Sequence, residues 1–371
     1  MKKQIVKEFI TVKKVRRLPP KEPAAPPPIP RRILVVGRCA LDMITVCDEH
    51  PIPGKLQRTE EGFWRLGGHA ANTCCVLRRL GTDCEFLGQL SSISAFESLS
   101  SSFNALGVDI SSCPRMPLEP PHQSIVIVRG QGTRTTVEYS NRKHELTYQQ
   151  FMGAVDYRKY SWIHFEARNL RDTLRMMQAV RDYNSRNEEA NILVSFGLVN
   201  LRAISLLLAD MADYVLVQKQ VLTTYAYMNG RETVWAVRDR MEVAHKRWLA
   251  NQPKKTPNPN KDATPLDENN CTLPVQKRPI IIYENYEEGA SCLLSDNTYF
   301  KVGGHQPQKI VDTIGEHDTF VGAFIYAMQQ VKLSLRDAME YATRATCHKI
   351  SEIGFDCLRC MPKDLISCYY A

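Results

Sequence analysis

A carboxylate at the start of a predicted helix is the first feature that suggests chemistry. The segment IVDTIGEHDTFVGAFIYAM, residues 310–328, runs from β-branched residues through Gly315 into a helical pattern with Asp318 in its first turn. A helix start presents unpaired N–H groups and a partial positive charge, which suits a phosphate group. Asp318 there can accept a proton from an attacking hydroxyl. From these residues alone, a simple helix cap is the commoner role for Asp318.

Two further carboxylates lie in the segment ILVVGRCALDMITVCDEHP, residues 33–51. Asp42 comes shortly after a continuous apolar run, and open α/β sheets bind their ligands beyond the ends of such buried strands. Asp42 and Asp48 are both carboxylates that can accept hydrogen bonds from sugar hydroxyls. Taken alone, Asp48 fits a solvated surface position better.

A glycine pair precedes the next predicted helix, in RLGGHAANTCCVLRRLG, residues 65–81. Gly67 and Gly68 permit a close approach of the backbone. His69 and Asn72 follow near the helix start, where their side chains can hydrogen-bond a polyol. This segment therefore predicts a second part of a substrate-binding site.

The elements that must position these residues alternate along the chain. Strands are expected at 33–36, 125–128, 162–165, 192–196, 214–217 and 280–283, and helices near 70–80, 170–184, 233–249, 318–331 and 335–350. This alternation predicts a layered α/β fold with a mostly parallel sheet. Residues 133–137, with alternating β-branched side chains, predict a half-exposed strand outside that core.

Composition places the chain among ordinary globular proteins. Its 371 residues are 43% hydrophobic and 24% charged, which excludes collagen-like, wholly disordered and small disulfide-scaffold classes. No apolar run reaches the ~18 residues of a membrane span, and the first twenty residues lack the apolar core of a secretory signal. The twelve cysteines are therefore expected to be reduced thiols of a cytoplasmic protein.

The net charge of +8 comes from the first 32 residues, which hold ten Lys or Arg and two Glu. The remainder is neutral, so no nucleic-acid partner is expected for the folded part. Contact of the tail with acidic lipid or RNA, or a mitochondrial presequence, stays open, but a solvated tail is commoner. Proline clusters predict a disordered basic tail at 1–31 and a disordered insertion at 252–276. This leaves 32–360 as one domain, followed by a C-terminal tail at 361–371.

Two common phosphate-binding motifs are absent, since the chain has no Walker pattern and no GxGxxG after its first strand. Instead, GGHAAN at 67–72 and DTIGEHDTF at 312–320 resemble, in this order, the two motifs of the ribokinase-like (PfkB) carbohydrate kinases. Within that family the ketohexokinases are the most similar branch, because of WIHFEARN at 162–169, EEGA at 287–290 and GFD at 354–356.

The resemblance covers roughly residues 32–357 and carries expectations about fold and activity. It implies a ribokinase-like three-layer α/β sandwich with a small β-sheet lid, built from parts of 39–66 and 120–140. It implies ATP-dependent phosphorylation of a ketose, fructose to fructose 1-phosphate, with ATP and Mg²⁺ as cofactors and K⁺ as a further candidate. A homodimer through the lid is also implied.

Site residues follow from the same resemblance. Asp318 would be the catalytic base, and the N–H groups of Gly315, Glu316, His317 and Asp318 would form an anion hole. The sugar would be bound by Asp42, Asp48, Gly68, His69 and Asn72, and the nucleotide by Gly289 and Gly315.

The chain departs from the family pattern where the phosphate should bind. Glu316 and His317 stand where the family has alanine and glycine, so they bring a carboxyl group and an extra Cβ next to a phosphate. His69 replaces the first asparagine of the other motif, and residues 217–220 supply no N-x-x-E motif, so no protein ligand for a metal is expected. A pseudokinase that binds a sugar or a protein therefore remains the alternative function. A ribose or adenosine kinase shares the same motifs.

Overall fold

The computed structural model describes residues 31–49, 51–59, 61–129, 133–187, 189, 191–251, 278–307 and 309–362. Apart from residues 31, 361 and 362, the two predicted tails and the predicted insertion lie outside this part of the chain.

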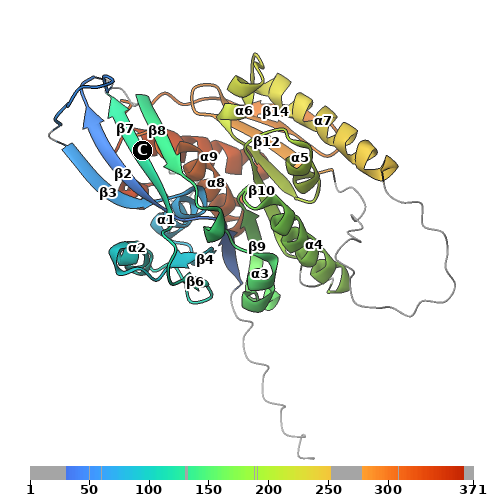
Figure 1. Ribbon diagram of the computed structural model, residues 1–371. Helices are drawn as coiled ribbons and strands as arrows, with labels where there is room; N and C mark the ends of the chain where they lie inside the picture. Colours follow the sequence, from blue (N-terminus) through green and yellow to red (C-terminus); the bar gives the residue numbers. More distant parts are fainter. Residues whose placement is uncertain are drawn as a thin grey trace, which may run out of the picture. The chain divides into compact units, whose positions relative to one another are not determined.

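A largely parallel sheet forms the centre of the described fold (Figure 1). Its strands lie in the order β14-β13-β12-β11-β10-β9-β1-β4, and all neighbours from β12 to β4 are parallel. Their bounds are β1 Arg32–Val36, β4 Cys84–Leu87, β9 Tyr160–Phe165, β10 Leu193–Leu198, β11 Tyr214–Val217, β12 Ile280–Asn285, β13 Gly289–Leu293 and β14 Tyr299–Val302. Only β13 and β14 join in antiparallel register.

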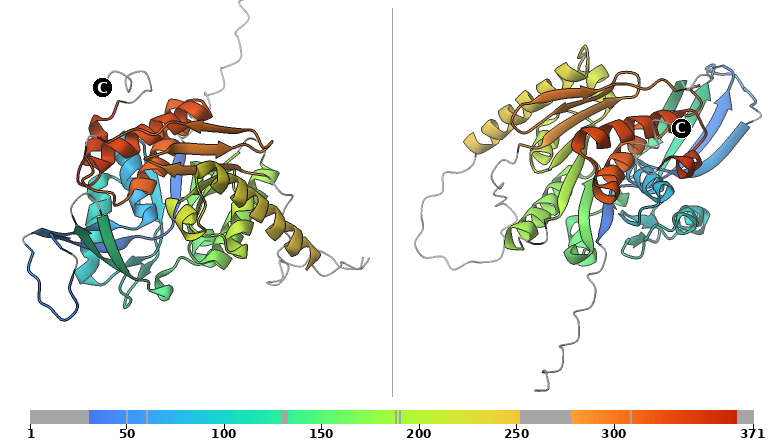
Figure 2. Two further views of the ribbon diagram at one scale, coloured as in Figure 1. Left: turned by 90° about the horizontal axis from the view of Figure 1, so that it is seen from above. Right: turned by 180° about the vertical axis from the view of Figure 1, so that it is seen from behind.

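Helices cover both faces of this sheet, as Figures 1 and 2 show. One face packs against α1 (His69–Leu80), α8 (Glu316–Tyr326) and α9 (Leu335–Ile350). The other packs against α4 (Leu170–Arg186), α5 (Ala203–Asp210) and α7 (Gly230–Ala250). The remaining helices are α2 (Glu97–Leu106), α3 (Tyr148–Ala154) and α6 (Lys219–Thr224).

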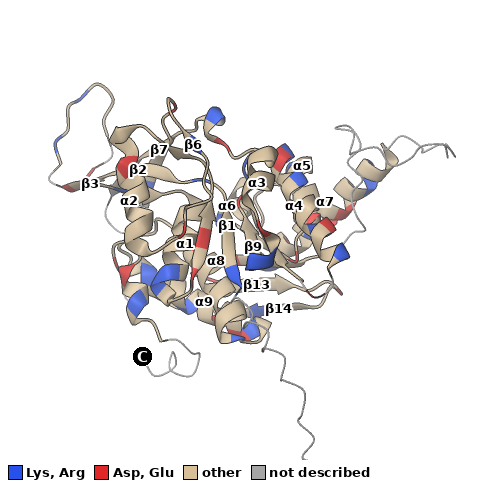
Figure 3. Ribbon diagram, turned by 90° about the horizontal axis from the view of Figure 1, so that it is seen from below, with Lys and Arg blue, Asp and Glu red and all other residues tan. Residues whose placement is uncertain are grey.

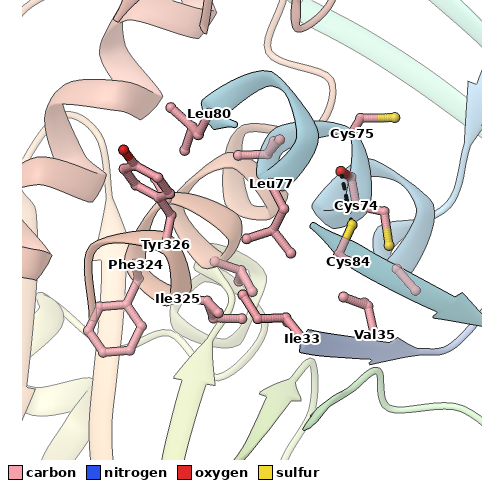
Figure 4. Close-up of a cluster of buried hydrophobic side chains, with 14 of the residues drawn as sticks. Ile33, Val35, Cys74, Cys75, Leu77, Leu80, Cys84, Phe324, Ile325 and Tyr326 are labelled. Atoms are coloured by element: carbon pink, nitrogen blue, oxygen red, sulfur yellow. Dashed lines mark hydrogen bonds between the residues drawn. The ribbon is translucent and has the colours of Figure 1, made fainter. Parts of the chain in front are cut away.

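The continuously apolar sequence of β1 is explained by the helices that cover both of its faces. Ile33 and Val35 are buried on the side of α1 and α8, and Leu34 and Val36 on the side of α4. A strand covered on both faces needs apolar residues at every position. Figure 4 shows the first of these two clusters, in which side chains of β1, α1 and α8 meet.

A second, smaller sheet extends to one side of the central sheet (Figures 1 and 2). Its order is β3 (Glu61–Gly67), β2 (Ala40–Cys47), β7 (His122–Arg129) and β8 (Thr133–Tyr139). We call it the small sheet. The short strands β5 (Leu90–Ser91) and β6 (Arg115–Met116) pair separately. The predicted α/β fold with a mostly parallel central sheet and a small sheet is thus confirmed.

Acidic and basic residues are interspersed over the described elements (Figure 3). Among the described helices, none combines the length and the apolar composition that a membrane crossing requires.

Candidate active site

A cavity of about 500 Å³ lies between the small sheet and the carboxyl ends of the central strands. On the side of the small sheet it is lined by Ala40, Asp42, Ser124, Val126, Arg134, Thr136 and Glu138. The rest of the lining is Arg38, Gly68, His69 and Asn72, residues 218–220 and Thr223, Glu284, and residues 314–318. Open α/β sheets bind ligands at this end of their strands, so the two clusters singled out in the sequence come together where a ligand is expected.

Asp42 lies on β2 and is almost fully buried. Ser124 on the neighbouring strand β7 donates a hydrogen bond to its carboxylate. Gly67 pairs with this region from β3, and a Cβ there would fall within 2.4 Å of all three carboxyl atoms of Asp42. The first glycine of the pair thus makes room for Asp42. Burial raises the pKa of Asp42, although Ser124 and Arg65 act in the opposite direction.

Gly68 has a different role, because it precedes α1 with φ = 95°. A Cβ at this position would approach the carbonyl oxygen of Arg38 to 2.7 Å. The left-handed conformation and the close approach both require glycine. This turn directs His69 and Asn72, at the start of α1, into the cavity.

Asp318 is held by both of these residues. His69 Nδ1 lies 2.7 Å from Asp318 Oδ1, and Asn72 Nδ2 donates to Asp318 Oδ2 over 2.8 Å. The negative charge of Asp318 raises the pKa of His69 to about 9. Burial alone would raise the pKa of Asp318, but the charge and hydrogen bond of His69 outweigh it and hold that pKa below its ordinary value. At neutral pH the two side chains form an ion pair.

The start of α8 faces the same cavity. Gly315 precedes the helix with φ = 77°, and a Cβ there would lie 2.6 Å from the ring of Phe355. Within the described residues, the N–H groups of Gly315, His317 and Asp318 make no hydrogen bond. Such free N–H groups at a helix start can bind an anion.

The loop before Gly315 is fixed by a buried ion pair. Lys349 Nζ lies 2.6 Å from the carbonyl oxygen of Asp312 and 3.0 Å from its Oδ2. Arg65 of β3 approaches the same carboxylate to 3.1 Å. Burial lowers the pKa of Lys349 to about 8, although Asp312 opposes this shift. Through Asp312, Lys349 connects α9 and Arg65 connects the small sheet to the loop that precedes the free N–H groups.

Glu316 and His317 sit in helical backbone with negative φ, so neither residue pays the cost that a side chain would incur in the left-handed conformation of Gly315. His317 Nδ1 lies 3.9 Å from Glu284 Oε2, and neither ring nitrogen makes a hydrogen bond in the described structure. Burial lowers the pKa of His317 to about 4, so the ring is neutral. Burial raises the pKa of Glu316 and, well above its ordinary range, that of Glu284. Both shifts act against the charged carboxylate form, which would repel a phosphate.

Several lining residues were not predicted. Arg38 Nη2 bonds Glu138 of β8 over 2.9 Å, and its Nε lies 3.4 Å from Glu166, which follows β9. Arg134 of β8 donates to Thr313 Oγ1 over 2.6 Å. Arg38 stands between the apolar run of β1 and Asp42, and that position was an available signal. Arg134 had none, because its partner is 179 residues away.

Two further lining residues that were not predicted are Lys219 and Glu284. Lys219 Nζ lies 3.7 Å from Glu287 and 5.1 Å from the ring centre of Tyr286. These contacts join α6 to the turn between β12 and β13.

Asp48 and Gly289 do not line this cavity. Asp48 is exposed beyond the end of β2, about 20 Å along the strand from Asp42. Gly289 begins β13 with φ = 90°, and a Cβ there would lie 2.2 Å from the carbonyl oxygen of Val302. The positive φ and this close approach both require glycine at the start of β13.

The described residues contain no group of three His, Cys, Asp or Glu side chains placed to hold a metal ion.

Comparison with known proteins gives concordant results. The chain matches the pfkB family carbohydrate kinase over residues 30–217. It is 25% identical over 328 residues to ketohexokinase of Mus musculus, which covers 88% of this chain and 98% of that protein. The fold is similar to that of ribokinase from Giardia lamblia, with a TM-score of 0.69, 13% identity and coverage of 92% and 100%. It is also similar to Arabidopsis thaliana ribokinase complexed with ribose and ATP, with a TM-score of 0.63, 15% identity and coverage of 92% and 98%.

Proposed function

Since this chain belongs to the pfkB family of carbohydrate kinases, we propose that it transfers the γ-phosphoryl group of ATP to a primary hydroxyl of a ketose, converting fructose to fructose 1-phosphate. One observation carries this proposal. Asp42 of the small sheet, Asn72 of α1 and Asp318 of α8 converge on one cavity beside free N–H groups. The similarity to mouse ketohexokinase supports a ketose as the acceptor.

In this mechanism the sugar lies between Asp42 and the start of α1, with its hydroxyl group facing Asp318 and His69. The base is provided by Asp318 together with the His69 that it holds. The N–H groups of Gly315, His317 and Asp318 stabilise charge on the phosphoryl group in transfer, so catalysis rests on positioning and electrostatics.

Nucleotide and metal requirements follow from the lining residues. Lys219 and Arg134 provide positive charge at the phosphate end of the cavity, and ATP fits there with its phosphates toward α8. Mg²⁺ would enter bound to ATP and would neutralise charge on the phosphates. The described residues contain no group of three His, Cys, Asp or Glu side chains that could hold the ion by themselves. K⁺ stays a further candidate cofactor, and at the loop before α8 the ammonium group of Lys349 already contacts Asp312.

The small sheet acts as a lid in this proposal. Three arginine contacts join it to the rest of the site, between Arg38 and Glu138, Arg65 and Asp312, and Arg134 and Thr313. Its outer face carries a row of paired apolar residues, Trp64, Met43, Ile125 and Val137, of which three are 69%, 46% and 60% exposed (Trp64, Ile125 and Val137). We propose that this row forms a homodimer contact with a second copy of the chain.

A binding protein is the competing function. Glu284, Glu316 and His317 crowd the phosphate end with buried polar groups, two of which lack hydrogen bonds at some atoms. A site of this kind would still bind the sugar but would not transfer a phosphoryl group to it. We further propose a cytoplasmic location, which the ten free cysteines of the described chain support.

A coupled assay of the purified protein with MgATP tests the proposal, with fructose, ribose and adenosine as parallel acceptors. We expect turnover with fructose above that with ribose or adenosine. Retained ketose binding without transfer to any acceptor would instead establish the binding protein.

A further inference from the structure

The two members of the Asp318–His69 pair differ in their access to the cavity. The side chain of Asp318 is 3% exposed, and both of its oxygens accept hydrogen bonds, one from Asn72 and one shared with His69. The side chain of His69 is 41% exposed. An incoming hydroxyl group therefore meets the imidazole before it meets the carboxylate.

The two nitrogens of His69 also differ. Nδ1 is committed to Asp318 Oδ1 at 2.7 Å, whereas Nε2 has no hydrogen-bond partner in the described part of the chain and belongs to a ring that lines the cavity. From this geometry we propose that Nε2 of His69 is the atom that takes the proton of the acceptor hydroxyl, and that Asp318 orients the ring and stabilises the resulting imidazolium. This inference rests on the proposed kinase function.

The proton transfer balances as follows. The hydroxyl O–H bond breaks, its proton passes to the lone pair of neutral Nε2, and the oxygen forms a bond to the γ-phosphorus while the bond from that phosphorus to ADP breaks. The product state is an imidazolium beside a carboxylate, which is a stable pair. If Asp318 took the proton from the same starting state, a neutral imidazole would remain beside a neutral carboxyl group. The raised pKa of His69 and the lowered pKa of Asp318 both disfavour that distribution of the proton.

Charged groups around His69 agree with this assignment. Asp318 is the strongest influence and raises the pKa of His69 to about 9. Glu166 beyond β9 acts in the same direction, whereas Arg38 after β1 opposes it. His317 on α8 and His164 on β9 also face this region, and burial keeps both neutral. The neutral, reactive form of His69 therefore becomes about 50-fold more abundant between pH 7 and pH 9, and the increase flattens as the pH approaches that pKa.

Two measurements on the full-length protein test the proposal. The first is kcat with MgATP and fructose between pH 6.5 and 9 for the wild type, His69→Asn, Asp318→Asn and the matched control His348→Asn, whose side chain is exposed and absent from the cavity lining. The second is the NMR titration of the histidine rings in the same proteins, together with calorimetric sugar affinity.

We expect the wild-type kcat to rise about 50-fold between pH 7 and pH 9 and one histidine to titrate near pH 9. His69→Asn should lower kcat at pH 9 by at least ~100-fold and abolish the rise, while sugar binding remains. Asp318→Asn should return the histidine pKa toward its ordinary value. Because Lys349 also titrates near pH 8, only the part of the rise that His69→Asn removes is assigned to His69.

Different results overturn different statements. A flat wild-type profile, or a His69→Asn protein as active as the wild type, would show that Asp318 accepts the proton itself and would reject this inference while the kinase function stands. A histidine titrating near its ordinary pH in the wild type also rejects it, even without turnover. A raised histidine pKa with no transfer at any pH rejects the proposed function and, with it, the catalytic role of His69.

Discussion

Asp42 and Asp48 belong to the same segment of the chain, but their surroundings differ. Asp42 is 5% exposed and accepts a hydrogen bond from Ser124 inside the cavity, whereas Asp48 is exposed beyond the end of β2. Both residues were predicted from the sequence to bind the sugar. Alternation along a strand does not separate them, because residues six positions apart lie on the same face. Their distances from the end of β2 do, and these become visible only once the strand bounds are known.

The first prediction compares these two residues by the same change. Asp42→Asn should weaken ketose binding by about 100-fold, because hydrogen bonds to a charged group contribute about 1.5–3 kcal/mol each. Asp48→Asn should leave the affinity unchanged. Isothermal calorimetry measures both, and nucleotide affinity serves as the control for intact folding. Equal losses in the two variants would contradict this assignment of the sugar subsite.

The second prediction concerns the substituted anion hole. Changing Glu316→Ala together with His317→Gly should raise kcat by about tenfold or more, because one well-placed donor to a developing oxyanion contributes about 3 kcal/mol and the two side chains crowd these donors. Steady-state kinetics at saturating MgATP checks this. Glu352→Ala, on the exposed surface, is the control. An unchanged or lower kcat would contradict this prediction and would show that Glu316 and His317 do not impair phosphoryl transfer at the start of α8.

At the scale of elements, the hydrophobic pattern predicted most of the strands that are buried on both faces, although it missed β4, whose four residues are all buried. Residues 33–36 and 214–217 correspond closely to β1 and β11, and 335–350 is the observed span of α9. The short strands β13 and β14 were missed, because their residues become strands by pairing with β12 and with each other. Strand formation that depends on a distant partner leaves little trace in local sequence.

The small sheet carries the third prediction. Trp64, Met43 and Ile125 are direct neighbours across three strands, and Trp64 is 69% exposed. Aromatic side chains at the centre of an interface often dominate its binding energy, so Trp64→Glu should weaken a homodimer by about 100-fold or more. Sedimentation velocity over a range of concentrations measures this. Leu118→Glu, an equally drastic change at an exposed leucine outside that row, should leave the dimer intact, and a wild-type monomer would disprove the contact.

At the scale of the whole molecule, the fold class was accessible from the sequence, whereas the convergence of the site was only partly so. Motif residues such as Asn72 and Asp318 were predicted, although nothing local indicates that they touch. Arg38 with Glu138 and Lys349 with Asp312 join residues far apart in the chain. Such pairs depend on how helices and strands pack, and single-sequence patterns do not encode that packing directly.

The fourth prediction follows from the buried thiols. Burial raises the pKa of Cys39, Cys75, Cys113, Cys292 and Cys347 to about 12. In the unfolded chain these thiols ionise near pH 8.5, so above about pH 9 the folded state binds more protons than the unfolded state. Stability must then fall as pH rises, by several kcal/mol at pH 10.

Urea unfolding in the presence of reductant checks this at pH 7.5 and pH 10. The transition midpoint should move to lower urea at pH 10. A midpoint that is the same or higher at pH 10 would contradict the burial of these thiols. The pH range up to 9 used for His69 avoids most of this loss.

Helices α1 and α8 are joined at their starts and along their lengths. His69 and Asn72 at the start of α1 hold Asp318, and farther on, Gly322 lies so close to Val76 that a Cβ would come within 2.7 Å of it. The helix start that we propose to face the sugar therefore cannot shift without the one that we propose to face the phosphates. The two substrates are then linked thermodynamically, and whatever factor the nucleotide applies to the affinity for sugar, the sugar must apply equally to the affinity for nucleotide.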